Sequence, residues 1–132
     1  MTTVPTSGLL RTALTLDAAM SGAMGVVLVA AAAPVAQATA LPAPLLVACG
    51  LFLMPYAAVL AWCASRAALP RWLVWALAGG NLLWAVECAA LPLLGLVAPN
   101  GWGIAFLAVQ AAAVAIFAEL YVIALRRAAR LA

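Results

Sequence analysis

Four long apolar runs, separated by short breaks, constrain the fold of this chain more than any other feature. The runs cover about residues 9–33, 43–65, 71–97 and 102–125. Each is near or above the roughly 20 residues that an α-helix needs to cross about 30 Å of hydrocarbon. We therefore predict an all-α membrane protein, in which residues 1–132 form a single membrane domain with four transmembrane helices.

The composition indicates lipid rather than water as the solvent of this chain. Hydrophobic residues make up 70% of the chain and charged residues 7%, whereas soluble domains contain about 45–50% apolar and about 25% charged residues. A soluble fold of this size leaves much of its surface in water, so it could not hide this apolar content. The net charge of +3 has a topological explanation and does not require a nucleic-acid partner.

All six positively charged residues are arginines, and their positions predict how the helices are oriented. One lies near the start of the first run, two flank the break between the second and third runs, and three follow the fourth run: Arg11, Arg66, Arg71, Arg126, Arg127 and Arg130. Since positive residues remain on the cytoplasmic side, we expect an antiparallel up-down-up-down bundle with both termini in the cytoplasm. The expected location is the inner (cytoplasmic) membrane of a bacterium.

A secretory signal peptide within residues 1–40 is the alternative interpretation of the first run. Arg11 precedes the apolar stretch, and Ala-Gln-Ala or Ala-Thr-Ala near its end resembles a cleavage site. Asp17 lies early in the segment that would form the apolar core of such a signal. We therefore favour a transmembrane helix that is retained.

Only three acidic residues occur, Asp17, Glu87 and Glu119, and all fall inside predicted spans. A charged side chain in hydrocarbon costs about 2.5–3.5 kcal/mol on insertion scales, so such residues are candidates for function. From the helix rise, Asp17 and Glu119 are expected at a similar depth in the cytoplasmic half, and Glu87 toward the outer side. Their functional interpretation is a path for protons or cations, or a polar ligand pocket.

A structural role is the alternative for each carboxylate, either as the partner of an arginine or in hydrogen bonds across helices. Arg11 is close enough to Asp17 in sequence to pair with it near the interface, because arginine side chains bend toward the headgroups. The same holds for Arg126 and Glu119. Glu87 has no arginine nearby in sequence, so it is the most interesting candidate of the three.

Two neighbours extend the candidate site around Glu87. Asn81 and Trp84 lie on one helix face with Cys88, and Glu87 follows Trp84 by three residues. Trp84 is predicted near the bilayer centre, and its buried N–H needs a partner such as Glu87 or Asn81. The group is either a binding pocket or an interhelical cluster whose hydrogen bonds are satisfied.

Catalytic, metal and cofactor sites are not indicated. The chain contains no histidine and three cysteines without metal-ligand spacing. Ser/His/Asp and Cys/His constellations cannot form, and zinc or haem would lack its usual nitrogen ligand. We expect no catalytic residue, no metal and no cofactor, and we expect that the protein is not an enzyme.

Several segments resemble those of small, uncharacterised four-helix proteins of bacterial inner membranes. The similar segments are Leu16-Asp17 followed by Ser21-Gly22-Ala23-Met24-Gly25, then Leu53-Met54-Pro55-Tyr56-Ala57-Ala58, and Phe117-Ala118-Glu119-Leu120. This resemblance covers most of the chain and implies no function. The chain is also distantly similar to the small multidrug-resistance transporters in length and in its intramembrane carboxylates. That family has a glutamate in its first helix, where this chain has Asp17, and the aromatic motifs of its site are absent here.

Three functional hypotheses follow. The first, which we favour because the loops are short and no catalytic constellation exists, is a membrane protein that acts through helix–helix contacts as a subunit, assembly factor or homo-oligomer. The second is a small proton- or cation-coupled transporter or channel that uses Glu87, Asp17 or Glu119. The third is a lipid- or quinone-related binding protein that uses Asn81, Trp84 and Glu87. The expected partners are membrane lipid and a second copy or another membrane protein, with no nucleic acid.

Overall fold

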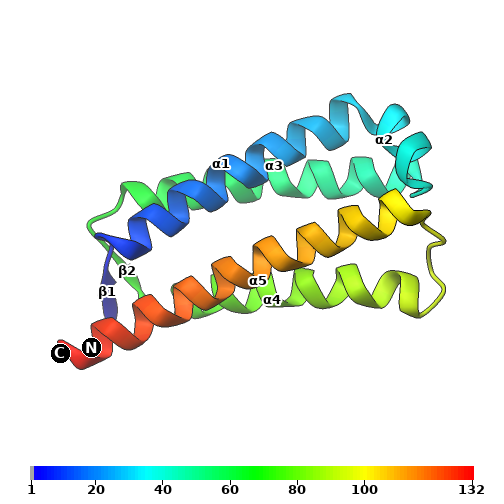
Figure 1. The fold of residues 1–132 in the computed structure, drawn as a ribbon. Coiled ribbons are helices and arrows are strands. Elements are labelled where there is room, and N and C mark those ends of the chain that lie inside the picture. Colours follow the sequence, from blue (N-terminus) through cyan, green and yellow to red (C-terminus); the bar gives the residue numbers. More distant parts are fainter. Residues whose placement is uncertain (1) are drawn as a thin grey trace.

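The computed structural model describes residues 2–132 and arranges them as two pairs of long helices (Figure 1). Within this range, four helices are long and apolar enough to cross a membrane. They are α1 (Leu9–Ala30), α3 (Ala43–Ser65), α4 (Arg71–Leu93) and α5 (Gly101–Arg130). The prediction of an all-α chain with four helices long and apolar enough to span a membrane is confirmed.

The first predicted break contains a short helix that the sequence did not lead us to expect. α1 ends at Ala30 rather than at residue 33, and α2 (Ala32–Thr39) follows after one residue. Pro34 lies in the first turn of α2, where backbone N–H groups have no acceptor within the helix. Proline, which has no N–H, therefore loses no helical hydrogen bond there. The proline that we read as a breaker therefore helps to begin a helix.

The ends of the last two helices also differ from the predicted ends. α4 ends at Leu93 rather than at residue 97, because Gly95 has a φ of +71°, a conformation typical of a residue just beyond a helix C-terminus. α5 continues to Arg130 rather than stopping at residue 125. Its last turns are rich in alanine and arginine, both strong helix formers, and these basic residues also suit the negative end of the helix dipole.

Glycines allow the two helices of the first pair to approach closely. α1 packs along α3, whereas α4 packs along α5. A Cβ added to Gly25 of α1 would lie 3.1 Å from the carbonyl oxygen of Gly50 of α3, and one added to Gly50 would lie 2.8 Å from that of Gly25. The small residues of Ser21-xxx-Gly25 predict such an approach, and the structure shows it between α1 and α3.

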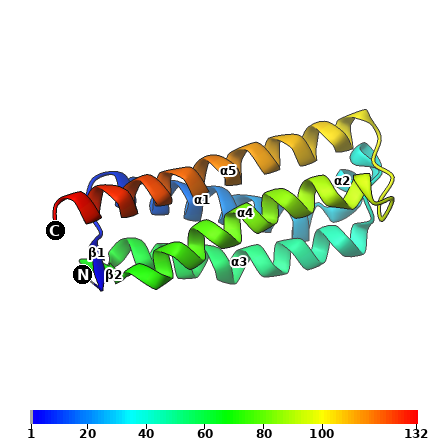
Figure 2. The same ribbon diagram turned by 90° about the horizontal axis from the view of Figure 1, so that it is seen from below.

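A two-stranded sheet, which was not predicted, ties the helix pairs together at the end that carries both termini. β1 (Thr3–Pro5) pairs antiparallel with β2 (Ala68–Pro70), so that Val4 lies opposite Leu69. The segment before α1 is thereby fixed to the connection between α3 and α4, as Figure 2 shows from a second direction.

Asn100 ties the helix pairs together at the opposite end. Its side chain accepts a hydrogen bond from the N–H of Gly103, which caps α5, and donates one to the carbonyl of Ala38 in α2. Its backbone N–H donates to the carbonyl of Thr39. The two helix pairs are therefore joined at both ends of the molecule, and the space between them lies midway.

Candidate functional site

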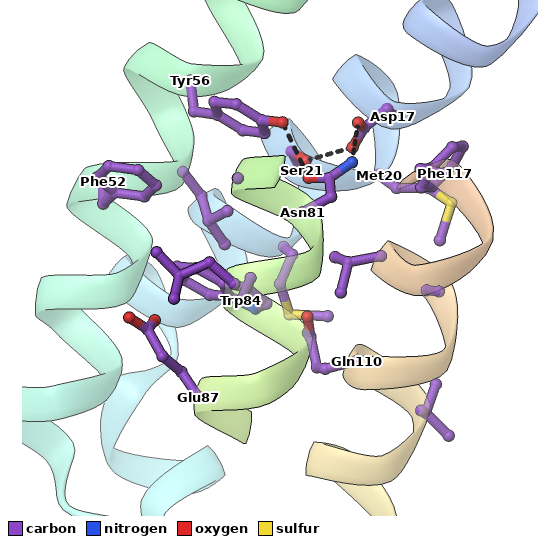
Figure 3. A pocket seen from close by; sticks show the side chains of 17 residues that line it. Asp17, Met20, Ser21, Phe52, Tyr56, Asn81, Trp84, Glu87, Gln110 and Phe117 are labelled. Atoms are coloured by element: carbon purple, nitrogen blue, oxygen red, sulfur yellow. Dashed lines mark hydrogen bonds between the residues drawn. The ribbon is translucent and has the colours of Figure 1, made fainter. Parts of the chain in front are cut away.

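A cavity of about 460 Å³ lies between the helix pairs, and all four long helices line it (Figure 3). This volume falls within the range of about 300–1,000 Å³ that is typical of small-molecule sites. Most lining side chains are apolar, and a polar cluster occupies one end.

Asp17 on α1 is the centre of the polar cluster. It is 2% exposed and accepts hydrogen bonds from the Asn81 amide of α4 (2.9 Å), the Tyr121 hydroxyl of α5 (2.7 Å) and the Ser21 hydroxyl (3.1 Å). The Tyr56 hydroxyl of α3 donates to the carbonyl oxygen of Asn81 (2.9 Å). Each long helix thus contributes at least one side chain to this group of five residues, which we call the Asp17 network.

The Asp17 network forms because its members lie at one level of the bundle. Asp17, Tyr56, Asn81 and Tyr121 each lie about 8–10 residues, or about 12–15 Å, from the helix end on the side of the termini. A polar group without a hydrogen-bond partner is costly in hydrocarbon. The carboxylate of Asp17 receives three donors, so its burial between four apolar helices is compensated by hydrogen bonds.

The structure does not place Glu87 and Asp17 in one cluster. Glu87 is exposed and lines the other end of the cavity, where it makes no hydrogen bond to another residue in the part of the chain described. Figure 3 shows its carboxylate beside Trp84, on the side of α3. Within residues 2–132 the Trp84 N–H donates to neither of the two partners considered from the sequence, Asn81 and Glu87, and the Asn81 amide oxygen accepts from Tyr56.

Trp84 is half-buried and belongs instead to a stack of aromatic rings. Its ring lies 5.9 Å from that of Phe52 with an angle of 15° between the planes, and Phe52 lies 6.0 Å from Tyr56 with an angle of 14°. The rings form one wall of the cavity, between the Asp17 network and Glu87 (Figure 3).

Glu119 and the arginines lie away from the cavity. Glu119 is exposed on α5 and is not among the lining residues, although it was expected at the depth of Asp17. The predicted pairing of Arg11 with Asp17 is wrong, because the Arg11 guanidinium donates to the carbonyl of Arg66 (3.3 Å). No arginine lines the cavity.

The sequence did not lead us to Tyr56, Tyr121 or Gln110. A signal for the two tyrosines existed, since a buried tyrosine hydroxyl normally requires a hydrogen-bond partner. Both lie well inside apolar runs, where side chains of another helix are the partners at hand. Gln110, the one amide in the fourth run, lines the cavity from α5 and is half-buried.

A second cavity of about 390 Å³ continues the first toward the Asn100 end of the molecule. Met24, Val109 and Gln110 line both cavities, and Trp102 lies at the far end of the second. One face of α5, from Phe117 to Trp102, therefore borders an almost continuous apolar space. At the rise of an α-helix this face is about 22 Å long.

The part of the chain that the structure describes contains no cluster of metal-ligating side chains. Among residues 2–132, no three His, Cys, Asp or Glu side chains lie close enough together to hold a metal ion. The three cysteines, Cys49, Cys63 and Cys88, are free thiols. The chemistry that remains at the cavity is hydrogen bonding, charge and contact with aromatic rings.

Comparisons of this chain with protein-family models, curated proteins and solved structures find no match. The class that the fold defines is therefore a small helical membrane protein with four candidate spans. Its function is argued below from the cavity and the residues that line it.

Proposed function

We propose that this protein binds an elongated, mainly apolar molecule within the bilayer, in the cavity between its two helix pairs. This is the lipid- or quinone-related binding role among the three sequence hypotheses. The observation that carries the proposal is the cavity itself, which has the volume of a ligand site, apolar walls from all four long helices and the Asp17 network at one end. Apolar pockets with a few convergent polar groups are typical of small-molecule sites.

The ligand enters from the side, through the lipid. The strand pair closes one end of the molecule and Asn100 closes the other. α3 and α4 are not among the closely packed helix pairs, and the lining residues along their seam are open to the surroundings. Phe52 of α3 is 57% exposed and Leu83 of α4 is 58% exposed. A membrane-soluble molecule reaches the cavity between these two helices without crossing water.

The proposed setting is the inner membrane of a bacterium, with the four helices as an antiparallel up-down-up-down bundle and both termini in the cytoplasm. The arginine-bearing helix ends gather at the end of the molecule where the N and C labels lie in Figure 1, which agrees with the positive-inside rule. Trp102, which is 78% exposed, lies at the opposite end, where an interfacial tryptophan is expected. The Asp17 network then lies in the cytoplasmic half of the bilayer.

Two adjacent glycines of α4 provide a matched test. A Cβ added to Gly79 or to Gly80 would meet no atom within 4 Å, but only Gly80 lines the cavity. Gly80→Leu therefore fills part of the cavity, whereas Gly79→Leu places the same side chain outside it. Both variants should fold, because leucine favours a helix by about 0.5–1 kcal/mol over glycine.

The measurement is native mass spectrometry of protein extracted gently from its own membrane. We expect one bound apolar molecule per chain in the original protein and in Gly79→Leu, and its loss in Gly80→Leu. Equal occupancy in the two leucine variants, or an original protein without any bound molecule, would contradict the proposal.

A second role, as a homo-oligomer or as a subunit of a membrane complex, is favoured by Gly79. Its exposed position with open space around it permits another helix to approach α4 closely, as small residues do in membranes. The same spectra test this role independently, because the mass of the assembly is read separately from that of the ligand. A complex that dissociates in Gly79→Leu but not in Gly80→Leu supports it, and a monomer throughout contradicts it.

A further inference from the structure

The charged side chains that line the two cavities are all acidic. Asp17 and Glu87 line the first cavity, whereas no arginine lines either one. A phosphate or carboxylate headgroup placed there would find no positive partner and would be repelled by carboxylates. The lining therefore disfavours a ligand whose polar end is anionic and favours a ligand whose polar end is cationic.

The two carboxylates are not equally available to a ligand. Asp17 is buried and already accepts three hydrogen bonds from side chains of the protein. Glu87 is exposed at the cavity and makes no hydrogen bond to another residue in the range 2–132. Of the two, Glu87 is the one whose oxygens are free to accept a bond from a ligand.

Aromatic rings lie close enough to Glu87 for both to contact the same positively charged group of a ligand. The Phe52 and Trp84 rings stack within 5.9 Å of each other, and Figure 3 shows the Glu87 carboxylate next to Trp84, on the same side as Phe52. Ring faces attract ammonium groups at about 6 Å or less, with tryptophan the strongest. Phe52 already stacks on Tyr56 and on Trp84, so Trp84 is the end ring of the stack and the one that offers a free face. A carboxylate beside that ring is an arrangement that suits an alkylated ammonium group.

We propose that the ligand is a cationic amphiphile, whose ammonium end is held between Glu87 and the Phe52–Trp84 stack while its apolar chain fills the cavity. The space along α5 that reaches Trp102 accommodates the remainder of a long chain. This inference rests on the binding function proposed above and adds the chemical class of the ligand.

The test compares two probes of equal chain length, dodecyltrimethylammonium and dodecanol, with protein in phosphatidylcholine nanodiscs. Bound probe per chain is counted by native mass spectrometry at several probe concentrations. We expect the ratio of bound cation to bound alcohol to fall about tenfold in Glu87→Gln, because this variant removes the charge of the carboxylate and leaves the Phe52 and Trp84 rings in place. Partitioning of the probes into lipid is common to all variants and does not change this comparison.

Glu119→Gln is the matched control, because Glu119 is also an exposed carboxylate but lies outside the cavity. Its cation-to-alcohol ratio should equal that of the original protein. Gly80→Leu should bind less of both probes. These two variants separate loss of charge at Glu87 from loss of the cavity.

The outcomes distinguish this inference from the proposed function. If Glu87→Gln leaves the ratio unchanged while Gly80→Leu lowers binding of both probes, the cavity binds apolar molecules without selecting cations, and this inference is overturned. If neither probe binds the original protein, the proposed function fails as well. Where the ratio does fall, repeating the titration in micelles of an uncharged detergent removes the choline ammonium of the lipid. Probe binding that rises in the micelles identifies a lipid ammonium as the competing occupant, and binding that stays the same identifies a free amine.

Discussion

Tyr121 on α5 donates a hydrogen bond of 2.7 Å to Oδ2 of Asp17 on α1, although 104 residues separate them in the chain. The same oxygen accepts a bond of 2.9 Å from the Asn81 amide of α4. One carboxylate oxygen therefore links the first helix pair to both helices of the second pair. These two bonds hold α1 at the level of Asn81 on α4 and Tyr121 on α5.

The first prediction concerns this bond. Tyr121→Phe and Asp17→Asn are combined in a double-mutant cycle, and unfolding is followed in mixed micelles with increasing sodium dodecyl sulfate. We expect a coupling free energy of about 0.6–1.7 kcal/mol, the range measured for hydrogen bonds between membrane helices. Thr15→Val is the control, because the Thr15 hydroxyl bonds only to the Arg11 carbonyl of its own helix. Additive effects of Tyr121→Phe and Asp17→Asn would show that the bond does not contribute to stability.

The second prediction concerns two glycines at the start of α5. A Cβ on Gly103 would overlap the carbonyl oxygen of Thr39 and lie 2.5 Å from the Cβ of Pro99, whereas one on Gly101 would meet no atom within 4 Å. Gly103→Ala should therefore destabilise the protein by about 1–3 kcal/mol, as overpacking does, and Gly101→Ala should not destabilise it. The measurement is the melting temperature of Gly103→Ala and of Gly101→Ala, both in one detergent. Equal melting temperatures would mean that α5 does not approach the end of α2 as closely as the structure has it.

The third prediction concerns Asn100. Asn100→Ala removes the side-chain cap of α5 and the bond to the carbonyl of Ala38, so we expect a loss of about 1 kcal/mol from the cap alone. Hydrogen exchange should rise in α2 and the first turn of α5 but not in the Asp17 network. Gln37→Ala, an exposed change in α2, is the control. Exchange that stays the same in α2 would argue against the Asn100 side chain as a link between the two helix pairs.

The fourth prediction concerns orientation in the membrane. A fluorescent protein that matures only in the cytoplasm should fluoresce when fused after Ala132, and alkaline phosphatase inserted after Asn100 should be active outside. Arg66→Ala with Arg71→Ala removes two of the six positive charges and should increase the fraction of inverted molecules. A non-fluorescent fusion after Ala132 together with an inactive phosphatase after Asn100 would reverse the proposed orientation.

The class of this protein could be predicted from the sequence alone. Four apolar runs long enough to span a bilayer do not have a soluble alternative at this composition. Breaks such as Pro99-Asn100-Gly101 place the helix ends to within a few residues. These features depend on the solvent and on local backbone chemistry, so they can be read without knowing which helix packs against which.

The arrangement of the candidate site required the tertiary structure. The sequence singled out Asp17, Asn81, Trp84, Glu87 and Glu119, but it ranked Glu87 first. For Asp17 it left open a functional role, a pair with Arg11 and hydrogen bonds across helices. Only packing decided that Asp17 is buried with Tyr121 and Asn81 while Glu119 faces outward. In a soluble helix the apolar stripe marks the buried face. In a membrane helix the surrounding lipid is as apolar as the protein interior, so no such stripe distinguishes the face that turns inward.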